Sequence, residues 1–187
     1  MNDVDIINGA SVPDYDGLFV IGSCDRRITF YSQQVRALNL ACALQASGRL
    51  DEKRRLAVIG AGAAGLSVSA ALAILEPEAV VHVYESEDRA LHLQQGCTRR
   101  YLHPHIYEWP AKGAADPRTC LPLLDWNAAA SARVAQQVQR EFDQIWLHRR
   151  QPSLKLLRKV TALERDGTAL RLSHAGSGEP SMGTDVT

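Results

Sequence analysis

The sequence predicts an α/β protein, and one glycine-rich segment with its two flanks supports that prediction. An apolar run over residues 56–60 leads into the glycine-rich turn GAGAAG, and small and apolar residues then continue to about Leu75. A second apolar run, AVVHVYE, follows at 79–85. The order of strand, turn, helix and strand predicts one right-handed βαβ unit with two parallel strands.

Length and composition are those of a globular protein with a buried core. The chain has 187 residues, 45% of them hydrophobic, which fits one domain or slightly more. Its 21 basic and 21 acidic residues cancel, so no net charge attracts nucleic acid or an acidic membrane. No run has the pattern of a secretory signal or a membrane span, and we expect a cytoplasmic protein.

The four cysteines argue against a metal site and against a disulfide framework. They lie far apart and form no C-x-x-C pair. We therefore expect no metal. The charge balance and the lack of a membrane span lead us to expect no nucleic-acid partner and no membrane partner.

Residues 1–54 are expected to form an N-terminal extension with one helix. Ser32 is suited to an N-cap and Gly48 to a C′ position, which predicts a helix over residues 33–47. Ahead of it, GLFVIG at 17–22 fits a strand or a buried loop. Three polar residues of the helix are interpreted as ordinary surface residues: Gln33, Gln34 and Arg36.

The glycine turn has the spacing of a pyrophosphate-binding loop. Gly60 permits a tight turn, Gly62 lets the backbone approach a diphosphate, and Gly65 lets the helix pack close to the strands. The unpaired amides and the dipole of the helix start favour an anion. The predicted cofactor-binding loop is Gly60, Ala61, Gly62, Ala63, Ala64 and Gly65.

Glu85 ends the second strand, twenty residues beyond Gly65. A carboxylate at this place in a Rossmann-like domain hydrogen-bonds the ribose hydroxyls. Because it would repel a 2′-phosphate, the sequence predicts an adenine dinucleotide such as FAD or NAD, and not NADP.

Over residues 55–89 the sequence resembles the flavoproteins with a glutathione-reductase-like FAD domain, through the motifs VIGAGAAGL and VHVYE. This superfamily contains oxidases, monooxygenases and reductases. The resemblance implies FAD as the cofactor, with NAD as the alternative. It implies contacts of Gly60, Gly62 and Gly65 with the FAD pyrophosphate and of Glu85 with the adenosine ribose.

Residues 91–110 contain many side chains capable of chemistry. Arg99 or Arg100 is expected to neutralise the pyrophosphate, because a guanidinium offers a bidentate fork to phosphate oxygens. The aromatic residues of YEWP at 107–110 have two interpretations, a wall for the flavin or a packed corner, and we favour the corner.

His103 and His105 flank Pro104 on a stiff segment, so their side chains are expected to diverge and not to share a metal. Either histidine has two interpretations: a proton carrier near a flavin, or a hydrogen-bonded structural residue.

A long amphipathic helix is predicted next, with Asp125 or Asn127 as its cap and an end at Pro152. Its apolar stripe runs from Val134 to Ile145. If two chains associate, this stripe is the surface we expect them to use, with one subunit covering the other's flavin.

Two runs, SLKLLRKVTAL and TALRLSHA, flank ERDG and predict a C-terminal β-hairpin. Residues 175–187 are expected to be a flexible tail. Residues 55–174 would then be a partial FAD/NAD(P)-binding domain, an incomplete Rossmann-like unit whose site a homodimer or a partner chain would complete.

Two functions follow from these patterns. The first is the FAD-binding part of a truncated flavin-dependent oxidoreductase, a poor catalyst by itself because the family's later flavin-enclosing segments are missing. The alternative is a non-catalytic or regulatory module that binds NAD or ADP-ribose. No catalytic residue is assigned.

Overall fold

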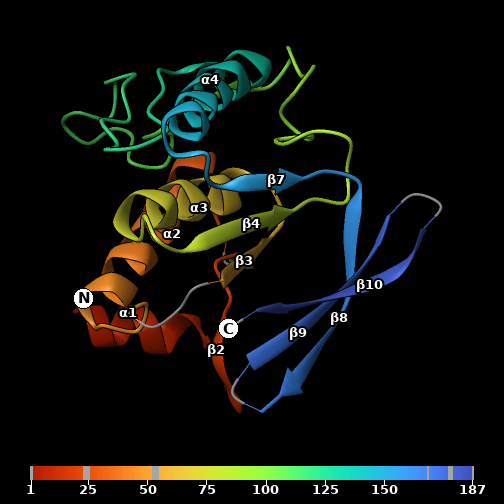
Figure 1. Cartoon of the computed structure of the whole chain (residues 1–187). Coiled ribbons are helices and arrows are strands. Elements are labelled where there is room, and N and C mark those ends of the chain that lie inside the picture. Colours follow the sequence, from red (N-terminus) through yellow and green to blue (C-terminus); the bar gives the residue numbers. More distant parts are fainter. Residues whose placement is uncertain (1, 23–25, 52–54, 168, 177–178, 187) are drawn as a thin grey trace.

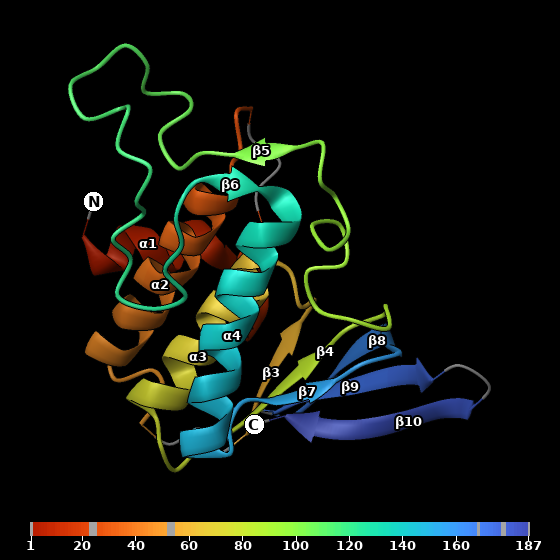
Figure 2. The same ribbon diagram turned by 90° about the horizontal axis from the view of Figure 1, so that it is seen from above.

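A parallel sheet of three strands lies between a layer of helices and an antiparallel sheet (Figures 1 and 2). The structure is a computed structural model that describes residues 2–22, 26–51, 55–167, 169–176 and 179–186. Its helices are α1 (Asp3–Ala10), α2 (Phe30–Ala46), α3 (Ala63–Leu75) and α4 (Ser131–Arg149). The strands are β1 (Ser11–Val12), β2 (Tyr15–Phe19), β3 (Arg55–Ile59), β4 (Val80–Tyr84), β5 (Tyr101–Leu102), β6 (Ala129–Ala130), β7 (Ser153–Lys155), β8 (Arg158–Asp166), β9 (Ala169–Gly176) and β10 (Glu179–Val186).

The central sheet has the order β3-β4-β7, and all three strands are parallel. The mixed α/β architecture predicted from the glycine segment is confirmed. The third strand, β7, is an unexpected addition, because it lies within the run at 153–163 that we expected to form one arm of the hairpin. Leu157 divides that run: its φ of 54° turns the chain between β7 and β8, and its N–H donates to the carbonyl of Glu87 at 3.1 Å.

Helix α3 is covered on several sides at once, which explains its lack of a polar face. Every residue from Gly65 to Ala73 is buried. The helix packs on β3 and β4, while α2 and α4 pack against it from the other side (Figure 2).

The apolar stripe of α4 is part of this core. Val134 and Val138 are fully buried, Phe142 is 2% exposed, and Ile145 packs against the same cluster. The expectation that this stripe forms a surface between two chains is wrong, because α3 already covers it. The N-cap of α4 is Ala130 and not Asp125 or Asn127.

The predicted C-terminal hairpin is confirmed and extended. β8 and β9 pair antiparallel, with Asp166 opposite Ala169. Residues 179–186, expected to be a flexible tail, form β10 and pair with β9. This antiparallel sheet contacts the face of the parallel sheet opposite the helices, where the Tyr84 and His174 rings lie 5.3 Å apart.

The N-terminal extension has more structure than the single predicted helix. Helix α1 and the β1–β2 hairpin precede α2. The N-cap of α2 is Thr29, three residues before the predicted Ser32, because the two residues form a reciprocal capping box with 2.9 Å bonds in each direction. Gly48 has the positive φ expected after the helix end.

Within the described ranges, no helix is both long and apolar enough to cross a membrane.

Gly65→Ala should destabilise the protein by about 3 kcal/mol, the upper part of the range for overpacking. A Cβ at residue 65 would lie 1.8 Å from the carbonyl oxygen of Gly60, and a backbone atom cannot rotate away. Urea denaturation followed by circular dichroism measures the change. The control is Gly9→Ala on α1, where a Cβ meets nothing within 4 Å and a gain of roughly 0.5 kcal/mol is expected. Unchanged stability of Gly65→Ala would contradict the close approach.

Candidate functional site

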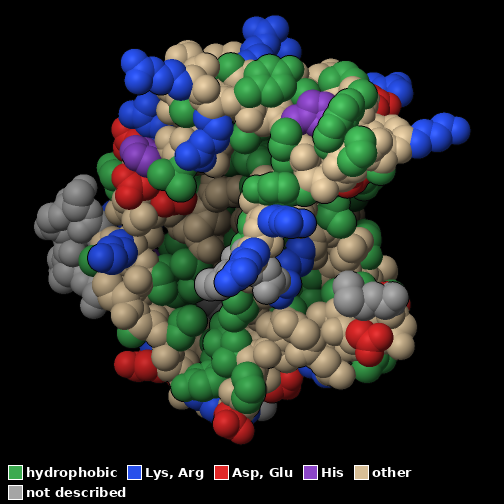
Figure 3. Space-filling model, turned by 180° about the vertical axis from the view of Figure 1, so that it is seen from behind, with side chains coloured by type: hydrophobic (Ala, Val, Ile, Leu, Met, Phe, Trp, Pro, Cys, Tyr) green, Lys and Arg blue, Asp and Glu red, His purple; other side chains and the backbone are tan. Residues whose placement is uncertain are grey.

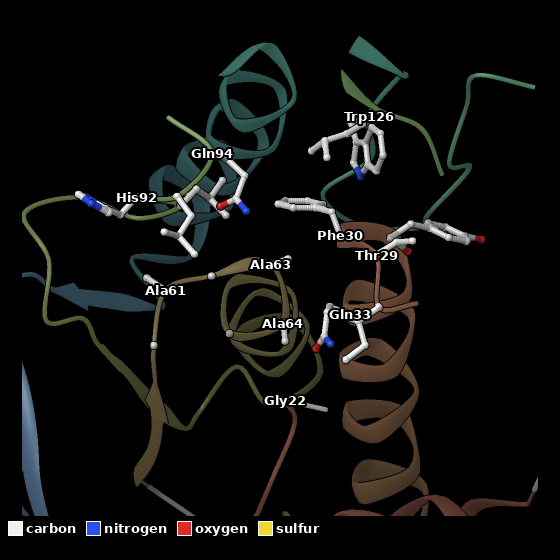
Figure 4. A pocket seen from close by; sticks show the side chains of 18 of the residues that line it. Gly22, Thr29, Phe30, Gln33, Ala61, Ala63, Ala64, His92, Gln94 and Trp126 are labelled. Carbon is white, nitrogen blue, oxygen red and sulfur yellow. The ribbon is translucent and has the colours of Figure 1, made fainter. Parts of the chain in front are cut away.

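A cavity of about 950 Å³ lies over the N-terminus of α3 (Figure 4). All six residues of the glycine turn line it, together with Glu85 and Arg100. Arg99 is not among its lining residues. Seen from behind, the molecule shows a hollow beside the centre of the view, with hydrophobic side chains along part of its edge (Figure 3).

The glycine turn is built by two positions that only glycine suits. Gly60 has a φ of 93°, and its N–H donates to the carbonyl of Tyr84 at 2.8 Å, which joins the turn to the end of β4. Gly65 leaves no room for a Cβ, as described above. The turn is therefore pressed between β4 and the first turn of α3.

Gly62 differs from these two glycines, because neither its backbone angles nor its neighbours in the chain require a glycine. It is the N-cap of α3, with φ −81° and ψ −169°, and a Cβ would meet nothing within 4 Å. No side chain caps this helix start. The first N–H groups of α3 have no partner within the helix, so a negatively charged group in the cavity would be stabilised by them.

Glu85 braces the turn from the end of β4. Its carboxylate accepts hydrogen bonds from the N–H of Ala61 at 2.7 Å, the N–H of Glu87 at 3.0 Å and the hydroxyl of Ser86 at 3.0 Å. Partial burial raises the pKa of this carboxyl, but these hydrogen bonds lower the pKa more, so that it lies below its ordinary value. An ionised carboxylate has about four acceptor sites, so capacity for a further donor remains.

Arg100 reaches the cavity because its backbone is fixed to the start of α4. Its carbonyl accepts the N–H of Ser131 at 2.7 Å, and the next two residues form β5, which pairs with β6. The Tyr101 hydroxyl donates to the carbonyl of Ala128 at 3.2 Å. These contacts join segments about 30 residues apart in the chain, and the sequence carries no local signal for them.

The two histidines have different surroundings. His103 lines the cavity, and its Nδ1 accepts the N–H of His105 at 3.2 Å, which places the proton of the neutral ring on Nε2. His105 instead packs edge-on against Tyr31, with its Nδ1 3.0 Å from Glu108. Their rings do not diverge as expected but lie edge to face, 6.2 Å apart. In the described part of the chain no three His, Cys, Asp or Glu residues are grouped to hold a metal.

The far wall of the cavity is held by Gln34, a residue that we expected at the surface. Gln34 is fully buried. Its Oε1 accepts from the Trp126 indole at 2.7 Å, and its Nε2 donates to the carbonyl of Leu124 at 3.0 Å. The Trp126 ring meets Phe30 edge-on at 5.7 Å. The signal for Gln34 was its spacing from Phe30 and Leu38, which share its buried helix face.

The YEWP segment is not the packed corner we expected. Tyr107 is 56% exposed and lines the cavity, and Trp109 is 72% exposed.

A short loop after β4 covers the start of α3. The N–H of Leu91 donates to the carbonyl of Ala61 at 2.9 Å, and the N–H of Gln94 donates to the carbonyl of Leu91 at 2.8 Å. Gln94 therefore lies over Ala63, the first residue of α3 (Figure 4). Sequence reasoning missed this residue because its position depends on the loop's return to the turn.

Comparisons with known proteins give only remote similarity. No family model matches the sequence, and no curated protein matches it. A solved structure of AlpK is similar at 14% identity with a TM-score of 0.45, over 72% of this chain and 30% of that chain. The Diels-Alderase PyrE3 of the pyrroindomycin biosynthetic pathway is similar at 11% identity with a TM-score of 0.45, over 72% of this chain and 31% of that chain. The chain thus spans less than a third of the length of either structure, and this similarity carries no argument about function.

Glu85→Gln should weaken the fold at neutral pH and have little effect in acid. Because the pKa of Glu85 is lowered on folding, its ionised carboxyl stabilises the protein fully above its ordinary value of 4.5. That contribution disappears as the pH falls through the lower value of the folded state. The test is to measure the urea midpoint of the parent protein and of Glu85→Gln from neutral pH into acid. The two midpoints should differ at neutral pH and converge in acid. The control is the exposed Glu78→Gln, and a constant gap between Glu85→Gln and the parent would contradict the assignment.

Proposed function

We propose that the chain binds an adenine dinucleotide that lacks a 2′-phosphate in the cavity over α3. FAD is the first candidate and NAD the alternative, with β3, α3 and β4 acting as a Rossmann-like unit. One observation carries the proposal: the glycine turn, the uncapped start of α3 and Glu85 line the same cavity.

The pyrophosphate fits the centre of this arrangement. The open space at Gly62 leaves the backbone accessible, and the first N–H groups of α3 are suited to phosphate oxygens. Arg100, which lines the same cavity, would supply a guanidinium to the diphosphate. Arg99 has no place in this assignment.

The adenosine ribose fits beside Glu85. This carboxylate is already fixed by three donors, so it would accept from a ribose hydroxyl without a loss of side-chain freedom on binding. Glu87 lines the cavity too, and the two negative charges disfavour a 2′-phosphate.

The resemblance of residues 55–89 to FAD domains favours the flavin and an oxidoreductase role. A bound flavin accepts a hydride or electrons, and the protein supplies binding, orientation and electrostatics. In this chain the turn and Glu85 would hold the nucleotide. His103 would present its Nε2–H as a hydrogen-bond donor at the cavity.

NAD should bind more tightly than NADP, by roughly tenfold or more, which corresponds to about 1.4 kcal/mol. The two ligands differ only by the 2′-phosphate that Glu85 and Glu87 would repel. Calorimetric titration with FAD, NAD and NADP measures the order, and a yellow purified protein would identify FAD directly. Glu85→Gln should narrow the gap between NAD and NADP. Tightest binding of NADP by the parent protein would contradict the proposal.

Gly62→Val should reduce dinucleotide affinity at least tenfold and leave the fold intact. Any residue adopts the backbone angles of Gly62, but a branched side chain would project where the pyrophosphate has to approach. Circular dichroism and titration with FAD and NAD test both parts. Gly9→Val on α1, also in open space, is the matched control. Unchanged affinity of Gly62→Val would show that the turn is only structural.

A further inference from the structure

The cavity changes its chemical character from one end to the other. At the β4 end it is lined by the carboxylates of Glu85 and Glu87, and in the middle by the glycine turn. At the α2 end its lining includes aromatic rings, among them Phe30 and Trp126. The volume of about 950 Å³ lies at the upper end of the range for small-molecule sites and accommodates a ligand with two ring systems.

The aromatic wall at the α2 end is rigid. Phe30 meets Trp126 edge-on, and the Trp126 indole is hydrogen-bonded to the buried Gln34. Gln34 is bonded in turn to the backbone at Leu124. Trp126 is only 2% exposed and Phe30 9%, so Phe30 presents most of the small apolar surface of this pair, and Trp126 holds it in place. Binding a ring against Phe30 requires no reordering of these side chains.

Two side-chain amides approach this end from opposite elements (Figure 4). Gln33 extends from α2 toward Ala64 on α3, and Gln94 extends from the loop that covers α3. Both side chains are half-buried, and among the described residues neither amide has a hydrogen-bond partner. Each amide can donate and accept, which is the complement of another amide or an imide.

We propose that the α2 end of the cavity holds the second ring of the dinucleotide, and that Gln33 and Gln94 hydrogen-bond the amide or imide edge of that ring. The inference rests on the proposed function. Once Glu85 holds the adenosine ribose and the turn holds the diphosphate, the second ring is the part of the ligand that is left for the α2 end. The class of ligand is a planar heteroaromatic ring with a polar edge, which an isoalloxazine and a nicotinamide both provide.

The test compares ligands with and without the second ring. FAD, NAD and ADP-ribose share the adenosine diphosphate half, and ADP-ribose lacks the ring. Gln33→Leu and Gln94→Leu keep the side-chain size and remove the amide, so each should lower affinity for FAD or NAD by about threefold to tenfold. Affinity for ADP-ribose should stay within about twofold, which also shows that the variants are folded.

Gln45→Leu, on the exposed side of α2, is the matched control and should leave all three affinities unchanged. Gln33→Glu provides a second variant with the shape of the amide and no donor. An equal loss of ADP-ribose affinity in the leucine variants would overturn the inference, because the amides would then contact the shared half. Unchanged affinity for both FAD and NAD would overturn it as well. If the parent protein binds none of the three ligands, the proposed function itself fails, and the inference fails with it.

Discussion

The contact between Gly65 and the carbonyl of Gly60 is the constraint on which the rest of the structure depends. A Cβ at residue 65 has no room, since it would lie 1.8 Å from that oxygen. The first turn of α3 is therefore pressed onto the glycine turn that follows β3. A helix so close to the sheet requires small residues on the contact side, and Ser69, one turn after Gly65 on the same side of α3, is small and fully buried. The remaining faces of α3 are covered by α2 and α4, which is why the helix is apolar all round.

Ala61, in the glycine turn beside this contact, connects the packing of α3 to the walls of the cavity. Its N–H donates to Glu85 at the end of β4, and its carbonyl accepts the N–H of Leu91 from the covering loop. Two walls of the cavity are thus hydrogen-bonded to the two sides of one residue. A shift of α3 away from the sheet would move the turn, the carboxylate and the loop together, so that stability and site geometry are parts of a single arrangement.

Local patterns in the sequence predicted the βαβ unit, the helices α2 and α4 and the β8–β9 hairpin. Contacts between distant segments account for two of the errors, at β7 and at Gln34. The turn at 60–65, the end of α3 before Pro77 and the hairpin of β8 and β9 depend on neighbouring residues, and all three follow the prediction. β7 joins the sheet only because Ser153 lies beside His82, far away in sequence. A run of alternating apolar residues looks the same whether it forms a hairpin arm or a third parallel strand. Gln34 was misplaced for a related reason: its partners at Leu124 and Trp126 lie about 90 residues away.

The whole chain has no net charge, but charged groups are unevenly distributed along the cavity. Two carboxylates lie at its β4 end, and Arg100 and the positive end of the α3 dipole line it as well. Near the α2 end, beyond the turn, Gln33 and the rings of Phe30 and Trp126 are uncharged. An anionic group is therefore repelled from the β4 end and attracted to the turn, and an uncharged ring meets least electrostatic opposition beside α2. Reversing an unsymmetrical ligand with a central diphosphate would leave the diphosphate in place and exchange only the two ends. The diphosphate therefore does not distinguish the two orientations. The choice between the two orientations is then made by the groups at the ends: a carboxylate that prefers hydroxyls at β4, and amides beside a rigid aromatic wall at α2.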